Sequence, residues 1–347
     1  MTSLLPSSEL PAVCICVPAY NAEKTIRETL VSLLAQTYAN LKILVVDNAS
    51  TDGTVSIVEA LSDARIQLHR NAENLGGEGN FNRCIQLADG KYTAIFHADD
   101  IYEPEMVAQQ VAFLEAHPSA GAVFTEASLI DASGKVFGGI QFPSTLRAAG
   151  ALLDFTTLFK AVLKHSNFLV CPSVMVRTTV YQQEIKSWRG ELYKSSADLD
   201  VWLRIAQHHK VGLLPAALMR YRISADQFSA KVRLQVERPD FFLVMDSYLA
   251  NTPVSQLLDE QDLDNYAKLD RRDKVMRAVN AVVAGQASMA KPLLTGVFSW
   301  AALKAALQTK KGLAVLLAAL YLKLLLALRQ ERLAQLSLGY CKRVLKR

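Results

Sequence analysis

The chain is poor in cysteine, and its first residues lack the features of a secretion signal. Five cysteines in 347 residues stand at positions 14, 16, 84, 171 and 341, without a C-x-x-C pair. An odd number of isolated cysteines indicates reduced thiols rather than a disulfide framework or a thiolate metal site. Residues 1–11 contain no lysine or arginine and no long apolar run, so we expect no secretory leader. These features predict a cytoplasmic protein.

The chain also lacks the two common glycine-rich phosphate-binding motifs. Residues 74–79 read Asn-Leu-Gly-Gly-Glu-Gly, which has neither the dinucleotide-binding spacing nor the lysine of a P-loop. Glycines permit a close approach of the backbone to a phosphate, and we expect this segment to be a flexible loop. At 51% hydrophobic residues, the chain is long enough to bury a sizeable core and to form more than one domain.

Short apolar runs alternate with helical patterns in the first hundred residues. The runs are residues 12–17, 41–46, 66–68 and 92–96. Between the first two, Ile26, Leu30, Leu33 and Leu34 fall on one helical stripe, which predicts a helix that packs on the sheet. Repeated strand and helix patterns favour an α/β fold with a mostly parallel central sheet between helical layers.

Carboxylates follow two of these apolar runs directly. Asp47 comes after residues 41–46, and His97-Ala98-Asp99-Asp100 comes after residues 92–96. Ligands of open α/β sheets bind beyond the carboxyl ends of the strands, and Mg²⁺ and Mn²⁺ prefer oxygen ligands. The alternative is that the acidic pair only begins a turn or a helix, since Pro104 shortly afterwards fits a helix start.

Four motifs in order resemble those of the family 2 glycosyltransferases, and the resemblance covers about residues 12–230. The motifs are Pro18-Ala19-Tyr20-Asn21, residues 45–54 (Val-Val-Asp-Asn-Ala-Ser-Thr-Asp-Gly-Thr), Asn74-Leu75-Gly76 with Asn82, and His97-Ala98-Asp99-Asp100. The family implies a GT-A (Rossmann-like) fold, inversion of configuration and a nucleotide-diphosphate sugar donor. The implied donor-binding residues are Pro18, Tyr20, Asn21, Asp47, Asn48, Gly76, Asn82, His97, Ala98 and Arg222.

The resemblance also implies a divalent cation, Mn²⁺ or Mg²⁺, with Asp99 as its ligand. His97 departs from the family's usual aspartate at the first position of the Asp-x-Asp element. A neutral imidazole can still bind a ribose hydroxyl or a metal. A histidine that only supports its neighbours is the alternative.

Asp198 is the candidate general base. The segment Ser195-Ser196-Ala197-Asp198 resembles the family's Glu-Asp element before an apolar helix, with Ala197 in place of the first acid. The resemblance implies that Asp198 removes the proton of the acceptor hydroxyl. Alternatively, Asp198 only caps a helix over residues 199–208, and Asp200 is a less favoured base because it points to another helix face.

Tyr221 and Arg222, with Ser224, Gln227 and Ser229, resemble the family's closing segment, which is often a mobile loop over the diphosphate. We expect Arg222 to share the charge of the departing diphosphate. A surface-exposed arginine without that role is the alternative.

The end of the chain is strongly basic. From residue 303 onward it holds ten Lys or Arg and one Glu, a net charge of +9, which leaves about −4 for the rest. Residues 312–328 are apolar except for Lys323 and are slightly short for a bilayer span. An in-plane amphipathic helix on an anionic membrane surface fits both facts. Packing on protein is the alternative, and spanning is a lesser one. Nucleic-acid binding is disfavoured because aromatic residues for stacking are not interleaved with the basic residues.

These observations predict three parts: a GT-A catalytic domain over residues 10–230, a helical extension over 231–300 and a basic amphipathic tail over 301–347. The predicted activity is metal-dependent, inverting sugar transfer to a glycan or lipid-linked glycan at the inner face of the cytoplasmic membrane. A nucleotidyltransferase and a catalytically inactive, membrane-bound relative are the alternatives. The sugar, the base, the acceptor and the oligomeric state are left open, because specificity resides in pocket shape.

Overall fold

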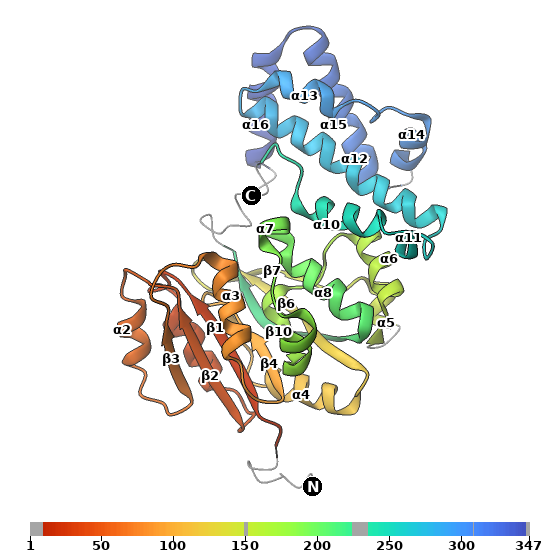
Figure 1. Cartoon of the computed structure of the whole chain (residues 1–347). Helices are drawn as coiled ribbons and strands as arrows, with labels where there is room; N and C mark the ends of the chain where they lie inside the picture. The colour runs from red at the N-terminus through yellow and green to blue at the C-terminus, as the bar shows by residue number, and fades with distance from the viewer. Residues whose placement is uncertain (1–9, 149–151, 224–234, 308, 345–347) are drawn as a thin grey trace. The chain divides into compact units, whose positions relative to one another are not determined.

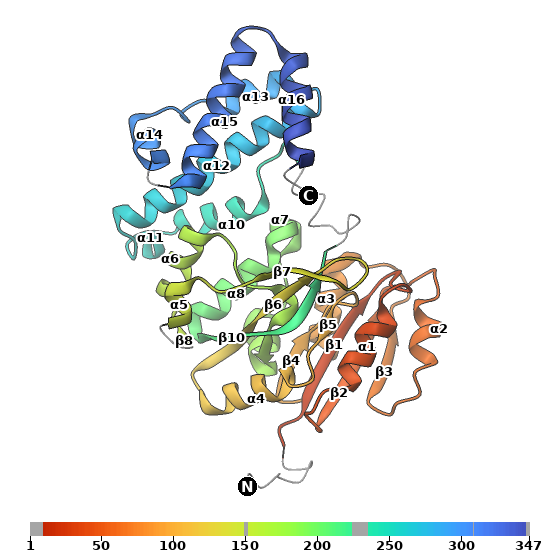
Figure 2. The same ribbon diagram turned by 180° about the vertical axis from the view of Figure 1, so that it is seen from behind.

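The computed structural model describes residues 10–148, 152–223, 235–307 and 309–344. The chain divides into two compact units, Met1–Ser224 and Ala225–Arg347. The first is an α/β unit and the second is helical (Figures 1 and 2).

A ten-stranded sheet forms the centre of the first unit. Its main path runs β3-β2-β1-β4-β9-β6-β10-β5, and β7 and β8 pair with β6 and β10. Pairing is parallel among β3, β2, β1 and β4 and between β6 and β10. The strands are β1 Val13–Ala19, β2 Leu41–Asp47, β3 Ile66–Arg70, β4 Tyr92–Ile95, β5 Ile101–Tyr102, β6 Ala120–Ile130, β7 Val136–Ile140, β8 Leu152–Leu153, β9 Met175–Arg177 and β10 Lys210–Arg222.

Helices cover both faces of this sheet, so the predicted three-layer α/β architecture is confirmed. The helix α1 lies in front of the sheet in Figure 2, whereas α3 lies in front of it in Figure 1, a view turned by 180°. The helices are α1 Ile26–Leu34, α2 Thr54–Glu59, α3 Gly76–Leu87, α4 Met106–Ala116, α5 Ser144–Ala148, α6 Phe155–His165, α7 Gly190–Tyr193 and α8 Ala197–His208.

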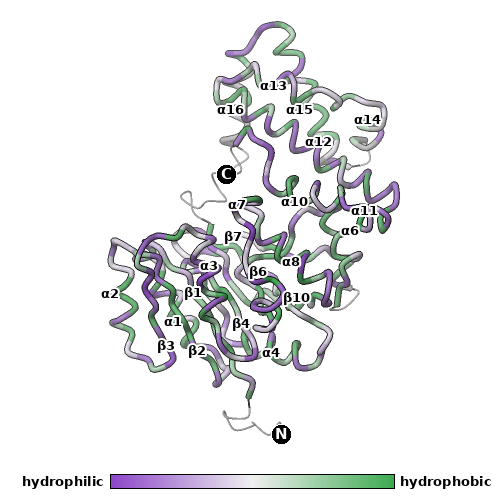
Figure 3. Tube along the Cα trace, in the orientation of Figure 1, coloured by the Kyte–Doolittle hydropathy of each residue, from purple (hydrophilic) through white to green (hydrophobic). Residues whose placement is uncertain are grey.

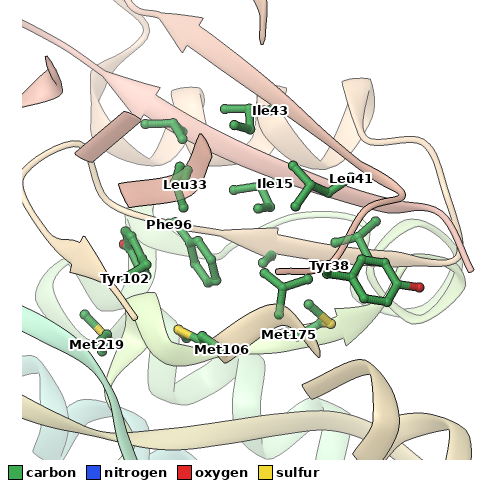
Figure 4. Close-up of a cluster of buried hydrophobic side chains, with 14 of the residues drawn as sticks. Ile15, Leu33, Tyr38, Leu41, Ile43, Phe96, Tyr102, Met106, Met175 and Met219 are labelled. Carbon is green, nitrogen blue, oxygen red and sulfur yellow. The ribbon is translucent and has the colours of Figure 1, made fainter. Parts of the chain in front are cut away.

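The core explains why the apolar runs become strands. Ile15 on β1 and Ile43 on β2 are fully buried and pack with Leu33 of α1 (Figure 4). Phe96, just after β4, stacks on Tyr102 of β5 with ring centroids 4.1 Å apart. Runs that are apolar at every position suit parallel strands, because these are covered on both faces.

Three cysteines are buried where β1 meets α3. Cys14 and Cys16 of β1 have their sulfurs 3.8 Å apart, and the Cys16 thiol contacts the backbone oxygen of Cys84 in α3. All three side chains are fully buried, whereas Cys171 is half-buried. The contact with Cys16 and burial raise the pKa of the Cys14 thiol, and the contact with Cys84 and burial raise the pKa of the Cys16 thiol, so these sulfurs stay protonated.

The expectation of a flexible glycine loop over residues 74–79 is wrong. The helix α3 begins at Gly76, which has a positive φ of 74° that favours glycine. The Asn74 side chain accepts a hydrogen bond from the Gly76 N–H at 2.8 Å. Side-chain hydrogen bonds therefore fix the turn, and the remaining glycines continue into the helix.

The second unit consists of helices α10 Asp240–Leu249, α11 Thr252–Ser255, α12 Glu260–Val283, α13 Ala287–Leu293, α14 Trp300–Leu307, α15 Lys310–Ala327 and α16 Glu331–Val344. The predicted C-terminal helical extension is confirmed. A capping box between Asp259 and Asp262 starts α12. Apolar side chains of α12, α13, α15 and α16 share one core. Of the helices described, none has the length and apolar character needed to cross a bilayer.

Candidate active site

The site is built on the ends of β1, β2 and β4, as the order of the motifs predicts. Ala19 at the end of β1 pairs in register with Asp47 at the end of β2. On the other side of β1, the Phe96 N–H donates to the Cys16 oxygen at 2.9 Å. This register places Asp47 and the segment that starts at His97 on the two sides of the β1 end.

Two strained residues shape the turns after β1 and β2. Asn21 and Ala49 have positive φ angles of 49° and 61°, a conformation that costs a non-glycine residue about 1–3 kcal/mol. The Asn21 N–H donates to the Ser50 hydroxyl, and the Asn21 side-chain oxygen accepts from the Thr51 N–H, both at 2.9 Å. The two turns therefore hold each other in place.

Three residues of these turns differ in exposure, and all three are predicted to bind the donor. Tyr20 is 49% exposed, Pro18 is half-buried, and Asp47 is 1% exposed. One Asp47 oxygen accepts from the Ser50 N–H at 3.2 Å. The other is buried and has no hydrogen-bond partner among the residues that the structure describes. A buried carboxylate oxygen in that state is ready to accept a hydrogen bond from a ligand.

Asn48 and Gly76 belong to an amide network. The Asn48 amide donates to the Asn74 side chain at 2.8 Å and to the Gly76 oxygen at 3.1 Å. Its oxygen accepts from the Leu75 N–H and from the Asn71 side chain. Asn48 therefore positions residues 71–76, the segment that leads into α3.

His97, Asp99 and Asp100 form a cluster able to hold a cation. Potential ligand atoms of the three side chains all lie within 4.8 Å of one another. His97 Nε2 and Asp100 Oδ2 are buried and lack a hydrogen-bond partner among the described residues. Burial lowers the pKa of His97, while burial and the nearby Asp99 raise the pKa of Asp100. A neutral imidazole beside two carboxyl groups is a donor set suited to a divalent metal ion.

The backbone of this cluster is held by α1. The Thr25 hydroxyl donates to the Ala98 oxygen at 2.9 Å, and the Thr29 hydroxyl donates to the Asp100 oxygen at 2.8 Å. Ala98 itself is 8% exposed. Little of the Ala98 side chain is therefore exposed for the predicted contact with the donor.

Arg222 fastens the same segment from β10. It is 5% exposed, which excludes a surface arginine, and it is the last residue of a strand rather than part of a mobile loop. Its Nε donates to the backbone oxygen of Asp99 at 2.8 Å, and its backbone N–H donates to a carboxylate oxygen of Asp100 at 2.8 Å. The guanidinium also pairs with Glu28 of α1. Ser224, Gln227 and Ser229 lie outside the described residues.

Asp198 is the second residue of α8, two positions beyond the N-cap position that the alternative assigned to it. The N-cap position is Ser196, without a side-chain cap. An Asp198 oxygen accepts from the Leu199 N–H at 2.7 Å, and the Asn167 amide lies 3.5 Å from the other oxygen. Burial nevertheless raises the pKa of Asp198 to about 6, which suits a group that exchanges a proton near neutral pH.

Cys171 connects the two halves of the site. Burial, with the nearby charges of Asp198 and Asp100, raises the pKa of the Cys171 thiol. The electrostatic influence of the acids at the end of β4 and on α8 therefore extends to one sulfur.

A row of aromatic rings joins the same two elements. Phe81 of α3 meets His97 edge-on and stacks on Trp188, which in turn meets Trp202 of α8 edge-on. The Asn82 side-chain oxygen accepts from the backbone N–H of Trp188 at 2.8 Å. Asn82 therefore anchors this row, and its predicted contact with the donor stays a prediction.

Asp200 has a structural role instead. It is fully buried, and its carboxylate pairs with Arg204 at 2.9 Å and with Arg189 at 3.7 Å.

Three residues that also support the site were not predicted: Glu28, Asn80 and Asn167. No local pattern marks Glu28 or Asn167. Asn80 lies four residues before buried Cys84 in α3, and its amide donates to the Val46 oxygen at 2.9 Å.

Comparisons with known proteins agree with this geometry. The family model "Glycosyl transferase family 2" matches residues 14–183. An uncharacterized glycosyltransferase of Haemophilus influenzae is 30% identical over 222 residues, covering 63% of this chain and 68% of that protein. A UDP-Glc:alpha-D-GlcNAc-diphosphoundecaprenol beta-1,3-glucosyltransferase of Escherichia coli, WfaP, is 36% identical over 103 residues, or 30% of this chain and 41% of that protein. The solved mannosyltransferase PcManGT of Pyrobaculum calidifontis, in complex with GDP-Man and Mn²⁺, has a TM-score of 0.55 at 19% identity and covers 97% of this chain and 87% of that one.

Proposed function

Because the chain belongs to glycosyl transferase family 2 and is a glycosyltransferase, we propose that it moves one sugar from a nucleotide diphosphate to an acceptor hydroxyl with inversion of configuration. One observation carries this proposal. The cation-binding cluster after β4 is joined to α8, which carries a carboxyl group with a pKa of about 6, by the ring contacts of His97, Phe81, Trp188 and Trp202.

The donor binds at the ends of β1 and β2 in this proposal. The unpartnered Asp47 oxygen accepts a hydrogen bond from the nucleotide base, and Pro18, Tyr20 and Asn21 line the pocket around it. The half-exposed ring of Tyr20 has open surface for such a contact. His97 and Ala98 then lie beside the ribose and the diphosphate.

A divalent cation, Mn²⁺ or Mg²⁺, fits the cluster of Asp99, His97 and Asp100. The support is the 4.8 Å spacing of their ligand atoms and the buried, unpartnered atoms of His97 and Asp100. Such an ion, when bound, offsets the negative charge on the departing diphosphate. Arg222 acts through Asp99 and Asp100, which it holds in position.

Asp198 is the proposed base. Its carboxylate takes the proton of the acceptor hydroxyl while the oxygen attacks the anomeric carbon from the face opposite the diphosphate. The bond from that carbon to the diphosphate oxygen breaks, and its electron pair stays with the nucleotide diphosphate. A single displacement inverts the anomeric configuration without a glycosyl-enzyme intermediate.

The proposed acceptor is a glycan or lipid-linked glycan of a bacterial surface polymer, which places the reaction at the inner face of the cytoplasmic membrane. The support is the sequence similarity to WfaP, whose name specifies a diphosphoundecaprenol-linked acceptor. A nucleotidyltransferase is disfavoured because Pro18-Ala19-Tyr20-Asn21 after β1 contains no glycine-rich basic loop.

The test is release of nucleotide diphosphate from a panel of nucleotide sugars, with Mn²⁺ or Mg²⁺ and with EDTA. We expect one donor to be cleaved slowly without acceptor, EDTA to stop the reaction, and Asp99→Asn to weaken the response to Mn²⁺. The matched control is Asp63→Asn, an acid that pairs only with Arg65 in the described structure and has no place at the site. Undiminished turnover in EDTA would contradict metal dependence, and no turnover of any donor would favour an inactive relative.

A further inference from the structure

The helix α15 is apolar on two opposite sides. Ala319, Leu322, Leu325 and Leu326 are buried in the core that α15 shares with α12. The other side carries large apolar side chains that are exposed by 40–59%: Leu313, Leu317, Leu320, Tyr321, Leu324 and Leu328. Figure 3 colours the trace of this helix by the hydropathy of each residue. At 3.6 residues per turn, these six positions fall within an arc of about 100°. Packing within the unit therefore leaves this second apolar side of α15 exposed.

The one charge inside the apolar run does not interrupt this exposed stripe. Lys323 lies outside the arc, and its ammonium nitrogen sits 4.4 Å from the centre of the Phe298 ring. A cation over an aromatic face is stabilised by the ring's quadrupole. The lysine that seemed to conflict with an apolar environment therefore has a partner within the unit.

The helix α16 continues the same surface. Leu333, Leu336 and Tyr340 are spaced three and four residues apart, and each is more than half exposed. The Tyr321 hydroxyl of the α15 stripe donates to the Ser337 hydroxyl of α16 at 2.9 Å. This bond brings the two stripes together, and we call the nine side chains the α15–α16 face.

Basic residues border this face. Lys310 precedes the stripe on α15, and Arg329 and Arg332 follow it; all three are exposed. Glu331 is the only acid from residue 303 to the end of the chain, against ten Lys or Arg. Leucines flanked by cations complement a bilayer surface, where the apolar side chains enter the acyl boundary and the cations meet anionic headgroups.

We propose that the α15–α16 face binds the surface of an anionic lipid bilayer with both helix axes in the membrane plane. The in-plane arrangement follows from the shared core, because the opposite side of α15 is covered by α12 and cannot also meet lipid. The surface lies within the second unit, and the inference does not depend on the identity of the donor or the acceptor.

The test is co-sedimentation of the full chain with vesicles of phosphatidylcholine alone and with about one third phosphatidylglycerol. We expect binding to the anionic vesicles that weakens with salt, and about tenfold or greater loss of binding for Leu317→Gln/Leu324→Gln. The matched control is Leu257→Gln/Leu263→Gln, two leucines of the same unit that are 44% and 50% exposed and lie outside the face. Circular dichroism checks that both double variants are folded.

Three results would overturn the proposal. One is a full chain that stays in the supernatant with both kinds of vesicle, which needs no variant. Another is equal loss of binding in the control variant. The third is a dimer in light scattering that Leu317→Gln/Leu324→Gln converts to a monomer without any change in vesicle binding, because the face would then join two copies. Nucleotide-sugar turnover is measured separately, so failure here leaves the proposed reaction untouched.

Discussion

Replacing Asp198 by Asn separates the catalytic role of this carboxyl group from its effect on stability. Burial raises its pKa from 3.8 to about 6, whereas the Leu199 N–H and the Asn167 amide favour the ionised form. An asparagine is nearly isosteric and keeps one oxygen that can accept from the Leu199 N–H, but it cannot accept the proton of an acceptor hydroxyl. We therefore expect transfer to fall by about 10²–10⁴-fold.

The pH dependence supplies a second readout. Only the ionised carboxylate acts as a base, so kcat/KM of the unchanged enzyme falls as the pH decreases through about 6. In the Asp198→Asn variant the residual activity lacks this limb. An acidic limb near pH 4, or full turnover in the variant, would refute the assignment of Asp198 as the base.

Stability moves in the opposite direction. The folded protein binds the Asp198 proton more tightly than the unfolded chain, so this group's contribution to stability is complete below about pH 4 and is lost as the pH rises through about 6. Above that range the ionised, partly buried carboxylate costs about 1–3 kcal/mol. Asp198→Asn should therefore melt a few degrees higher than the unchanged chain at pH 7.5 and at the same temperature near pH 4. Asp240→Asn, at the start of α10, is the matched control and should change neither transfer nor its pH profile.

Two further predictions concern donor binding and the support of the cation site. Asp47→Asn replaces the buried carboxylate oxygen that has no partner in the described structure. We expect the KM for the donor to rise about 10–100-fold, as for a lost hydrogen bond to a charged group, with little change in melting temperature. An unchanged KM would show that the nucleotide base binds elsewhere. Arg222→Gln leaves the Asp99 oxygen and the Glu28 carboxylate without their partner, so we expect a destabilisation of about 2–4 kcal/mol and a weaker response to Mn²⁺ in a titration; normal cation affinity would show that Asp99 and Asp100 need no such support.

The local pattern of the chain was sufficient to predict the elements that carry the site. Runs of apolar residues marked β1, β2 and β4, and the acids directly after them identified the sheet edge where they meet. Parallel strands place their carboxyl ends at one edge, so Asp47 and Asp99 could be expected together before any coordinates were known.

Contacts between residues far apart in sequence could not be predicted in this way. The start of α3 depends on two hydrogen bonds of Gly76: its backbone oxygen accepts from the Asn48 amide, and its N–H donates to the Asn74 side chain. These bonds outweigh the loop preference of the glycines. The burial of Arg222 depends on Glu28, a residue 194 positions earlier in the chain. The sequence offers Asp200, two residues after Asp198, as a second candidate base. Its pairing with Arg204 identifies it as structural.

Alkylation of the three buried cysteines at β1 and α3 can report when the central sheet opens. Alkylating reagents attack the thiolate, and Cys14, Cys16 and Cys84 are shielded from solvent, the first two with a raised pKa. Modification of these sulfurs therefore requires β1 to separate from α3, whereas half-buried Cys171 needs a smaller excursion. The kinetics of alkylation thus distinguish local opening near the proposed catalytic carboxyl group from separation of the sheet itself.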